Sequence, residues 1–250
     1  MRDPLAGRLD RPLAIAHRGD PIPLRENTVD AIRSAVALGA DIVEIDVKTT
    51  QDGVCVVLHD DSLVRLWGVD RDIRTMTAAE VAAVGERAQR IPTLEDVLAL
   101  FTGTDTAVMV DMDSGEWAPA AWATTRRAVA AGVVRHTQVV WCGDVGGMRQ
   151  VRAADAEARI FLSWGEAAVD GPPSDELVQA LRPEAFNPYW RVLDLGGREW
   201  AAERGLPVSC WTVDDPAMMR QIIAQGVDAV ISNDIRALLT VLRDAQEESA

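Results

Sequence analysis

Three histidines are the side chains of this sequence best suited to moving protons near neutral pH. His17 and His59 each end an apolar run, in IAHRGD and VLHDD, whereas His136 precedes one, in GVVRHTQ. Catalytic groups of closed α/β sheets lie where the strands end, and residues at the opposite face usually serve stability. We therefore expect His17 and His59 to be catalytic and His136 to be a surface residue.

Two pairs of acids have the spacing that places both side chains on one face of a strand. Glu44 and Asp46 lie in VEIDV, and Asp111 and Asp113 lie in VMVDMD. A sheet interior of Val and Ile accepts such carboxylates only with a cation or a shared proton. Oxygen ligands suit Mg²⁺ or Ca²⁺. We expect a divalent cation with these four acids as its ligands; for Glu44 and Asp46 the alternative is that they face outward and pair with Lys48 or Arg33.

Arginine and tryptophan residues are candidates for binding the substrate. Arg18 can bind a phosphate oxygen through its planar fork, or it can form a salt bridge to the local acids. Trp141, Trp164 and Trp211 fall near the ends of apolar runs. They could line a pocket for an alcohol or a cationic head group, and packing in the core or a lid is the alternative.

Short runs rich in β-branched residues alternate with helical patterns along the chain, with no linker-like break. The predicted strands are Leu13–His17, Ile42–Lys48, Ala107–Asp113, Gln138–Cys142, Arg159–Ser163, Glu184–Asn187, Pro207–Thr212 and Asp228–Ser232. Eight strand-then-helix units in 250 residues favour an α/β fold, a single (β/α)8 TIM barrel over residues 1–250. An open doubly wound sheet is the alternative, but the turn GDPIPLREN lacks its usual glycines.

The segment after the second strand departs from this alternation. TTQDG separates that strand from another apolar run, VCVVLHD, and so short a connection cannot cross over between parallel strands. Asp52–Gly53 is a favourable turn sequence. We therefore predict a short antiparallel hairpin that projects beyond the barrel. Folding it about Asp52 places His59 opposite Ile45, beside the first acid pair.

The net charge and the cysteines of the chain indicate which molecules it can bind and where it is located. A net charge of −14 opposes nucleic acid and anionic membranes, so an anionic substrate needs local positive charge. Cys55, Cys142 and Cys210 lie far apart in apolar runs, which indicates reduced, buried thiols. Neither a signal peptide nor a membrane-spanning stretch is evident. We expect a cytoplasmic protein with a small-molecule substrate and no stable membrane insertion.

These residues belong to a series of short motifs that keeps its order from about residue 14 to 240. The motifs are His17-Arg18-Gly19, Glu26-Asn27-Thr28, Gly39-Ala40-Asp41, Glu44-x-Asp46, Thr50-x-Asp52-Gly53, His59-Asp60, Ile91-Pro92-Thr93-Leu94, Trp211-Thr212-Val213-Asp214 and the segment from Gly226 to Asn233. Together they resemble the signature of glycerophosphodiester phosphodiesterases.

The resemblance implies a barrel that uses one divalent cation to hydrolyse glycerophosphodiesters to glycerol 3-phosphate and an alcohol. It implies that His17 and His59 are the acid–base pair and that Arg18 binds phosphate. It further implies that Glu44 and Asp46 bind the metal. Trp211 would line the substrate pocket.

Position 113 departs from the family pattern. Where the family usually has Glu-x-Lys, this chain has Asp111-x-Asp113, which replaces an expected positive charge by a negative one. Asp113 could strengthen the metal site or recruit a second cation. The alternatives are a metal-dependent module that binds phosphoesters without hydrolysis, or a lysophospholipase D-like enzyme. We expect the hydrolase, because both histidines and the first acid pair are present.

Overall fold

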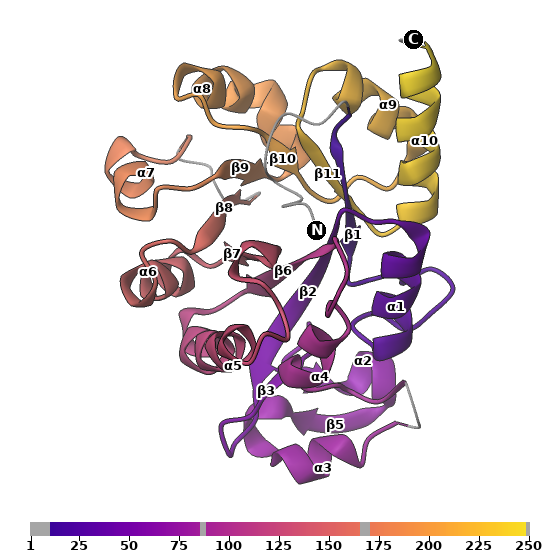
Figure 1. Ribbon diagram of the computed structural model, residues 1–250, viewed down its shortest axis with the longest axis vertical. Helices are drawn as coiled ribbons and strands as arrows, with labels where there is room; N and C mark the ends of the chain where they lie inside the picture. Colours follow the sequence, from indigo (N-terminus) through magenta and orange to yellow (C-terminus); the bar gives the residue numbers. More distant parts are fainter. Residues whose placement is uncertain (1–10, 86–88, 166–170, 249–250) are drawn as a thin grey trace.

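An eight-stranded parallel barrel forms the centre of the structure, a computed structural model that describes residues 11–85, 89–165 and 171–248. The strand order is β10–β11–β1–β2–β6–β7–β8–β9, and the parallel bridges Phe186–Val208 and Tyr189–Trp211 close the circle. The strands are β1 Leu13–His17, β2 Ile42–Thr49, β6 Ala107–Met112, β7 Val139–Gly143, β8 Arg159–Trp164, β9 Ala185–Pro188, β10 Ser209–Cys210 and β11 Ala229–Ser232. The predicted (β/α)8 TIM barrel is therefore confirmed (Figure 1).

Helices surround the barrel because each strand has two apolar faces. The outer strand faces pack against helices in one large apolar cluster, and the inner faces form a second cluster that includes Ile15, Met109 and Phe161. The surrounding helices are α1 Val29–Leu38, α4 Leu94–Ala99, α5 Ala118–Ala130, α6 Val145–Ala154, α7 Asp175–Leu181, α8 Gly197–Glu203, α9 Pro216–Ala224 and α10 Ile235–Glu248. Among the described residues, no helix combines the length and apolarity of a membrane span.

The predicted hairpin is confirmed. β2 extends beyond the barrel and pairs antiparallel with β3 (Cys55–Val57), with Val47 opposite Val57 and Thr49 opposite Cys55. Gly53 takes the left-handed conformation that the turn requires, with φ +84°. The Leu58 N–H donates to the Asp46 carbonyl at 3.0 Å, so the same register carries His59 back to the rim of the barrel.

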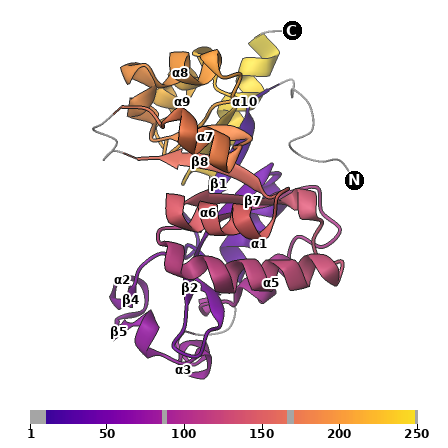
Figure 2. The same ribbon diagram turned by 90° about the vertical axis from the view of Figure 1, so that its left-hand side faces the viewer.

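The chain directly after the hairpin forms a two-stranded sheet and a one-turn helix that were not predicted. β4 (Ser62–Leu63) and β5 (Val69–Asp72) make a small antiparallel sheet around α2 (Val64–Trp67), and α3 (Ala78–Ala82) follows. Elements this short carry no periodic signal that a sequence can reveal. The segment has its own apolar cluster and projects from one end of the barrel in both views (Figure 1; Figure 2).

Candidate active site

His17 is held at the end of β1 by the last strand of the barrel. Its Nδ1 donates to Asn233 Oδ1 at 2.7 Å, and Asn233 is in turn fixed by Asp214, which accepts its backbone N–H and its Nδ2 at 2.8 Å each. The other ring nitrogen, Nε2, lies 3.8 Å from Glu44 Oε2. Burial, and then the charge of Arg18, lowers the pKa of His17. The imidazole is therefore neutral at neutral pH, with Nε2 free to accept a proton.

Arg18 sits in a left-handed turn that aims its backbone and its side chain at the acids. Its φ is +58°, and Gly19 follows with φ +93°, where a Cβ would lie 2.7 Å from the Ala31 carbonyl carbon. The Arg18 N–H donates to Glu44 Oε2 at 3.0 Å, and Nη1 donates to Glu26 at 2.9 Å.

One nitrogen of this guanidinium is not used in a hydrogen bond. Arg18 Nε lies 3.2 Å from Asp46 Oδ2, but the two atoms lack hydrogen-bond geometry, and the buried Nε has no hydrogen-bond partner within the described ranges. A buried donor without a partner is costly. Arg18 is therefore suited to an anionic ligand.

Three carboxylates lie side by side at this rim. Asp46 on β2 is the register partner of Asp111 on β6, and Glu44 precedes Asp46 by two residues on the same face of the strand. Burial and the charges of Asp46 and Asp111 raise the pKa of Glu44 well above its usual range. Burial and the charge of Asp46 raise the pKa of Asp111 to about 7. The cluster is therefore short of positive charge.

These three carboxylates suit a metal ion because of the kind of donor atoms they offer, and not because they already have a coordination geometry. In the described part of the chain, no three histidine, cysteine or acidic side chains lie close enough together, as they are placed, to hold a metal ion. Asp46 instead accepts a hydrogen bond from Asn27 Nδ2 at 2.7 Å. Hard oxygen donors that repel one another are nevertheless the environment that a divalent cation stabilises. Gly143 keeps space beside them, because a Cβ there would lie 2.4 Å from Asp111 Oδ1.

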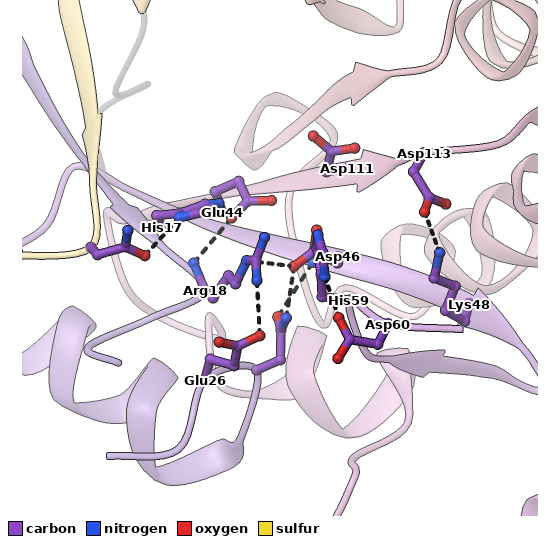
Figure 3. A network of polar contacts seen from close by, with 12 residues as sticks. His17, Arg18, Glu26, Glu44, Asp46, Lys48, His59, Asp60, Asp111 and Asp113 are labelled. Carbon is purple, nitrogen blue, oxygen red and sulfur yellow. Dashed lines mark hydrogen bonds and ion pairs between the residues drawn. The ribbon is translucent and has the colours of Figure 1, made fainter. Parts of the chain in front are cut away.

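Asp113 lies apart from this cluster. Its carboxylate pairs with Lys48 Nζ and accepts the Trp117 Nε1–H at 2.7 Å, and its side chain is 58% exposed (Figure 3). Lys48 is 1% exposed, and its Nζ also lies 3.0 Å from Asp61. This placement does not support the prediction that Asp113 is a metal ligand. The positive charge that the family pattern places at position 113 is present here on the neighbouring strand, as Lys48.

His59 reaches the same rim from the hairpin. Its Nδ1 donates to Asp60 Oδ1 at 2.6 Å, and its side chain is 41% exposed. Asp60 stays ionised at neutral pH, because hydrogen bonds from Arg65, opposed by partial burial and reinforced by His59, lower its pKa to about 2. His59 thus presents Nε2 as its free nitrogen and has a carboxylate behind it. His136 is distant from this site and pairs with Asp155 at 2.7 Å, as expected of a surface residue.

The opposite side of the barrel mouth carries aromatic rings. Trp211 lies with its ring centroid 5.5 Å from that of Tyr189, and its Nε1 donates to the Asn187 carbonyl at 2.9 Å. Trp211 packs against the inner apolar cluster. Trp141 differs, because it packs in the outer cluster among the helices and does not line the mouth.

Several residues that hold these groups in place were not given roles from the sequence. Asn27, Asp214 and Asn233 fall inside the motifs named above, but nothing in their spacing indicates what they contact. The sequence indicated nothing about Asp60 except that it follows His59. Such contacts depend on the closed barrel, since Asn233 and His17 are joined only when the last strand pairs with the first.

Comparison with known proteins connects this geometry to a family. The model of the glycerophosphoryl diester phosphodiesterase family matches residues 17–237. The chain belongs to this family. A glycerophosphodiester phosphodiesterase from Caldanaerobacter subterraneus subsp. tengcongensis is 29% identical over 242 residues, which are 92% of this chain and 98% of that protein.

Solved structures show the same fold. A phosphodiesterase from Oleispira antarctica, determined in complex with the product sn-glycerol 3-phosphate, has a TM-score of 0.83 at 21% identity and covers 93% of this chain and 97% of its own. A glycerophosphodiester phosphodiesterase from Thermotoga maritima has a TM-score of 0.75 at 24% identity, with 92% and 98% covered.

Proposed function

We propose that this member of the family hydrolyses glycerophosphodiesters to glycerol 3-phosphate and an alcohol with the help of a divalent cation. One observation carries the proposal: two imidazoles, three carboxylates and the Arg18 guanidinium lie at one rim of the barrel, and the buried Nε–H of Arg18 has no hydrogen-bond partner among the described residues (Figure 3). Those are the groups that phosphoryl transfer needs for proton transfer and for charge stabilisation.

Glu44, Asp46 and Asp111 are the residues that would hold the cation. The mutual repulsion that raises the pKa of Glu44 and Asp111 would be relieved by bound positive charge. Their oxygen donors suit Mg²⁺ or Ca²⁺. When bound, a divalent cation stabilises the negative charge that develops on the phosphoryl oxygens. Asp113 is left out of this set because its carboxylate is engaged by Lys48 and Trp117.

Arg18 is the proposed phosphate ligand, and Trp211 is the proposed wall of the substrate pocket. A phosphate oxygen can accept from the Arg18 Nε–H, which makes no hydrogen bond within the described part of the chain, in the charge-assisted geometry typical of guanidinium groups. The indole N–H of Trp211 is already bonded to Asn187, so its ring contributes apolar surface. The two groups bind different parts of one diester.

The two histidines are proposed to divide the proton transfers. His17 is neutral and largely desolvated, with 18% of its side chain exposed, so it takes the proton from the attacking hydroxyl group. That hydroxyl belongs to water, or to the substrate's own glycerol. In the second case a cyclic glycerol phosphate forms as the alcohol leaves, and water then opens it to glycerol 3-phosphate. In this division His59 donates a proton from Nε2 to the leaving alcohol, and the Asp60 carboxylate, which accepts from Nδ1, compensates the positive charge of the ring. Each transfer is expected to accelerate the reaction about 10²–10⁴-fold.

The direct test is to measure release of glycerol 3-phosphate from glycerophosphoethanol by the purified protein, with EDTA and then with Mg²⁺ or Ca²⁺ added back. We expect turnover that EDTA abolishes and a divalent cation restores. Metal-dependent binding of the ester without turnover would instead identify a phosphoester-binding module. Cleavage of a lysophospholipid but not of the short ester would identify the lysophospholipase D-like alternative.

A further inference from the structure

Arg65 on α2 joins two parts of the site that are far apart in sequence. Its Nε and Nη2 donate to Asp60 at 2.6 and 3.0 Å, and its Nη1 and Nη2 donate to Glu26 at 3.0 and 2.6 Å. All three guanidinium nitrogens are thus engaged by two carboxylates. Asp60 follows the hairpin, whereas Glu26 belongs to the loop between β1 and α1.

Both of those carboxylates contact a group of the proposed site. Asp60 Oδ1 accepts from His59 Nδ1 at 2.6 Å, and Glu26 Oε1 accepts from Arg18 Nη1 at 2.9 Å. The contacts form an unbroken chain of alternating charge in the order His59, Asp60, Arg65, Glu26 and Arg18. Asp60 therefore has a fixed orientation only while Arg65 holds both of its oxygens.

The position of Arg65 argues against a role confined to stability. Its side chain is 46% exposed, and exposed ion pairs usually contribute only about 0–1 kcal/mol. Two hydrogen bonds from the forked Arg65 guanidinium to each carboxylate mainly fix the orientations of those carboxylates. A carboxylate released from that fork can rotate, and the imidazole that depends on it rotates as well.

We propose that Arg65 is a positioning residue for proton donation to the leaving alcohol. It fixes Asp60, which in turn keeps His59 Nε2 directed at the barrel mouth. Glu26 retains its contact with Arg18 when Arg65 is removed, so phosphate binding is affected less than proton donation. This inference rests on the proposed function and adds to it a residue outside the barrel.

The experiment compares two esters of glycerol 3-phosphate with different leaving groups. Ethanol must be protonated as it leaves, whereas 4-nitrophenol leaves without a proton donor. The matched control is Arg71→Ala, because Arg71 lies in the same projecting segment and is similarly exposed but contacts Glu80 and the Thr75 carbonyl instead.

For Arg65→Ala we expect kcat on the ethyl ester to fall about 10- to 100-fold, a part of what a general acid supplies. On the 4-nitrophenyl ester kcat should change less than about threefold, and KM should change little on either ester. Arg65→Lys keeps the charge but loses the fork, so it should lie between wild type and Arg65→Ala. Arg71→Ala should match wild type on both esters.

Equal losses on the two esters, or no loss on either, would overturn the role of Arg65 while leaving the proposed function intact, provided that the wild type hydrolyses both. A wild type that hydrolyses neither ester would refute the proposed function and this inference with it. Circular dichroism of each variant establishes that it is folded, and added guanidinium should restore part of the activity that Arg65→Ala loses on the ethyl ester.

Discussion

The ends of β1 and β3 each present a histidine to the same barrel rim, but in different surroundings. His17 ends a barrel strand with 18% of its side chain exposed, and the partner of its Nδ1 is the neutral amide of Asn233. His59 is 41% exposed beyond a hairpin, and the partner of its Nδ1 is the carboxylate of Asp60. An amide and a carboxylate both fix the orientation of a ring, but the neutral amide stabilises a positive charge on the ring less than a carboxylate does.

This difference suggests how one rim can hold a base and an acid of the same residue type. Desolvation penalises the charged form of His17, and the ion pair behind His59 compensates the charge of its ring. The general lesson is that the second contact of each imidazole distinguishes the two roles. The following changes either remove that distinction or make it measurable.

The largest effect is expected when either ring is removed. His17→Ala and His59→Ala should each lower kcat on glycerophosphoethanol by about 10²–10⁴-fold, because each loses one proton transfer. His136→Ala is the control, since that histidine pairs with Asp155 away from the rim, and it should retain full activity. Steady-state release of glycerol 3-phosphate is the measurement, and full activity in both rim variants would refute the assignment.

The next effect concerns the acids beside His17. Glu44→Gln removes one of three adjacent carboxyl groups that disfavour one another's ionisation, so we expect a higher melting temperature than wild type in EDTA. The variant should also lose the rise in melting temperature that a divalent cation gives the wild type, since a ligand stabilises only the state that binds it. Thermal denaturation with and without Mg²⁺ or Ca²⁺ measures both. An undiminished metal-induced shift would exclude Glu44 as a ligand.

A smaller effect is expected at the carboxylate behind His59. Asp60→Asn keeps a hydrogen-bond acceptor but removes the charge, which makes the surroundings of His59 resemble those of His17. We expect kcat on the ethyl ester to fall about tenfold, a fraction of the contribution of the acid itself. Unchanged kcat would mean that the charge of Asp60 does not distinguish the two histidines.

The pH dependence of the wild-type enzyme tests the surroundings of His17. A general base must be neutral, and the pKa of His17 is lowered from 6.5 by burial and by Arg18. The decline of the wild-type kcat/KM toward acid pH should therefore have its midpoint below pH 6.5. A decline that is already half complete above pH 6.5 would contradict the neutral, desolvated state of His17.

The smallest effect is expected at Asp113. Asp113→Asn leaves Lys48 paired with Asp61 and leaves the three proposed ligands unchanged. The metal concentration that gives half-maximal activity should stay within about twofold of wild type, because the Asp113 carboxylate contacts Lys48 and Trp117 and is not among the proposed ligands. A tenfold increase in that metal concentration would show that Asp113 is a metal ligand.

The fold and the location of the site could be predicted because they follow from local patterns. The spacing of Glu44 and Asp46 indicated a shared face, and the turn at Asp52–Gly53 fixed a hairpin register that the structure confirms. The strand ends were predicted within one or two residues for most of the barrel. These features depend on the period of a strand and on turn geometry, which a sequence displays directly.

The contacts between strands could not be predicted in the same way. Asp113 follows Asp111 by two residues, yet β6 ends at Met112, and the register that places Asp46 opposite Asp111 brings Lys48 to Asp113 one step further on. Lys48 was weighed only as an outer-face partner of the acids. The alternation that puts Cys142 inside the barrel and Trp141 outside would have removed Trp141 from the predicted pocket.

The central claim, that His17 accepts a proton and His59 donates one, is tested most directly by measuring kcat for His17→Ala and His59→Ala on the ethyl and 4-nitrophenyl esters of glycerol 3-phosphate. We expect His59→Ala to regain most of the wild-type rate on the 4-nitrophenyl ester, whose leaving group needs no proton, while His17→Ala stays inactive on both. Equal recovery in the two variants, or recovery in His17→Ala alone, would contradict it.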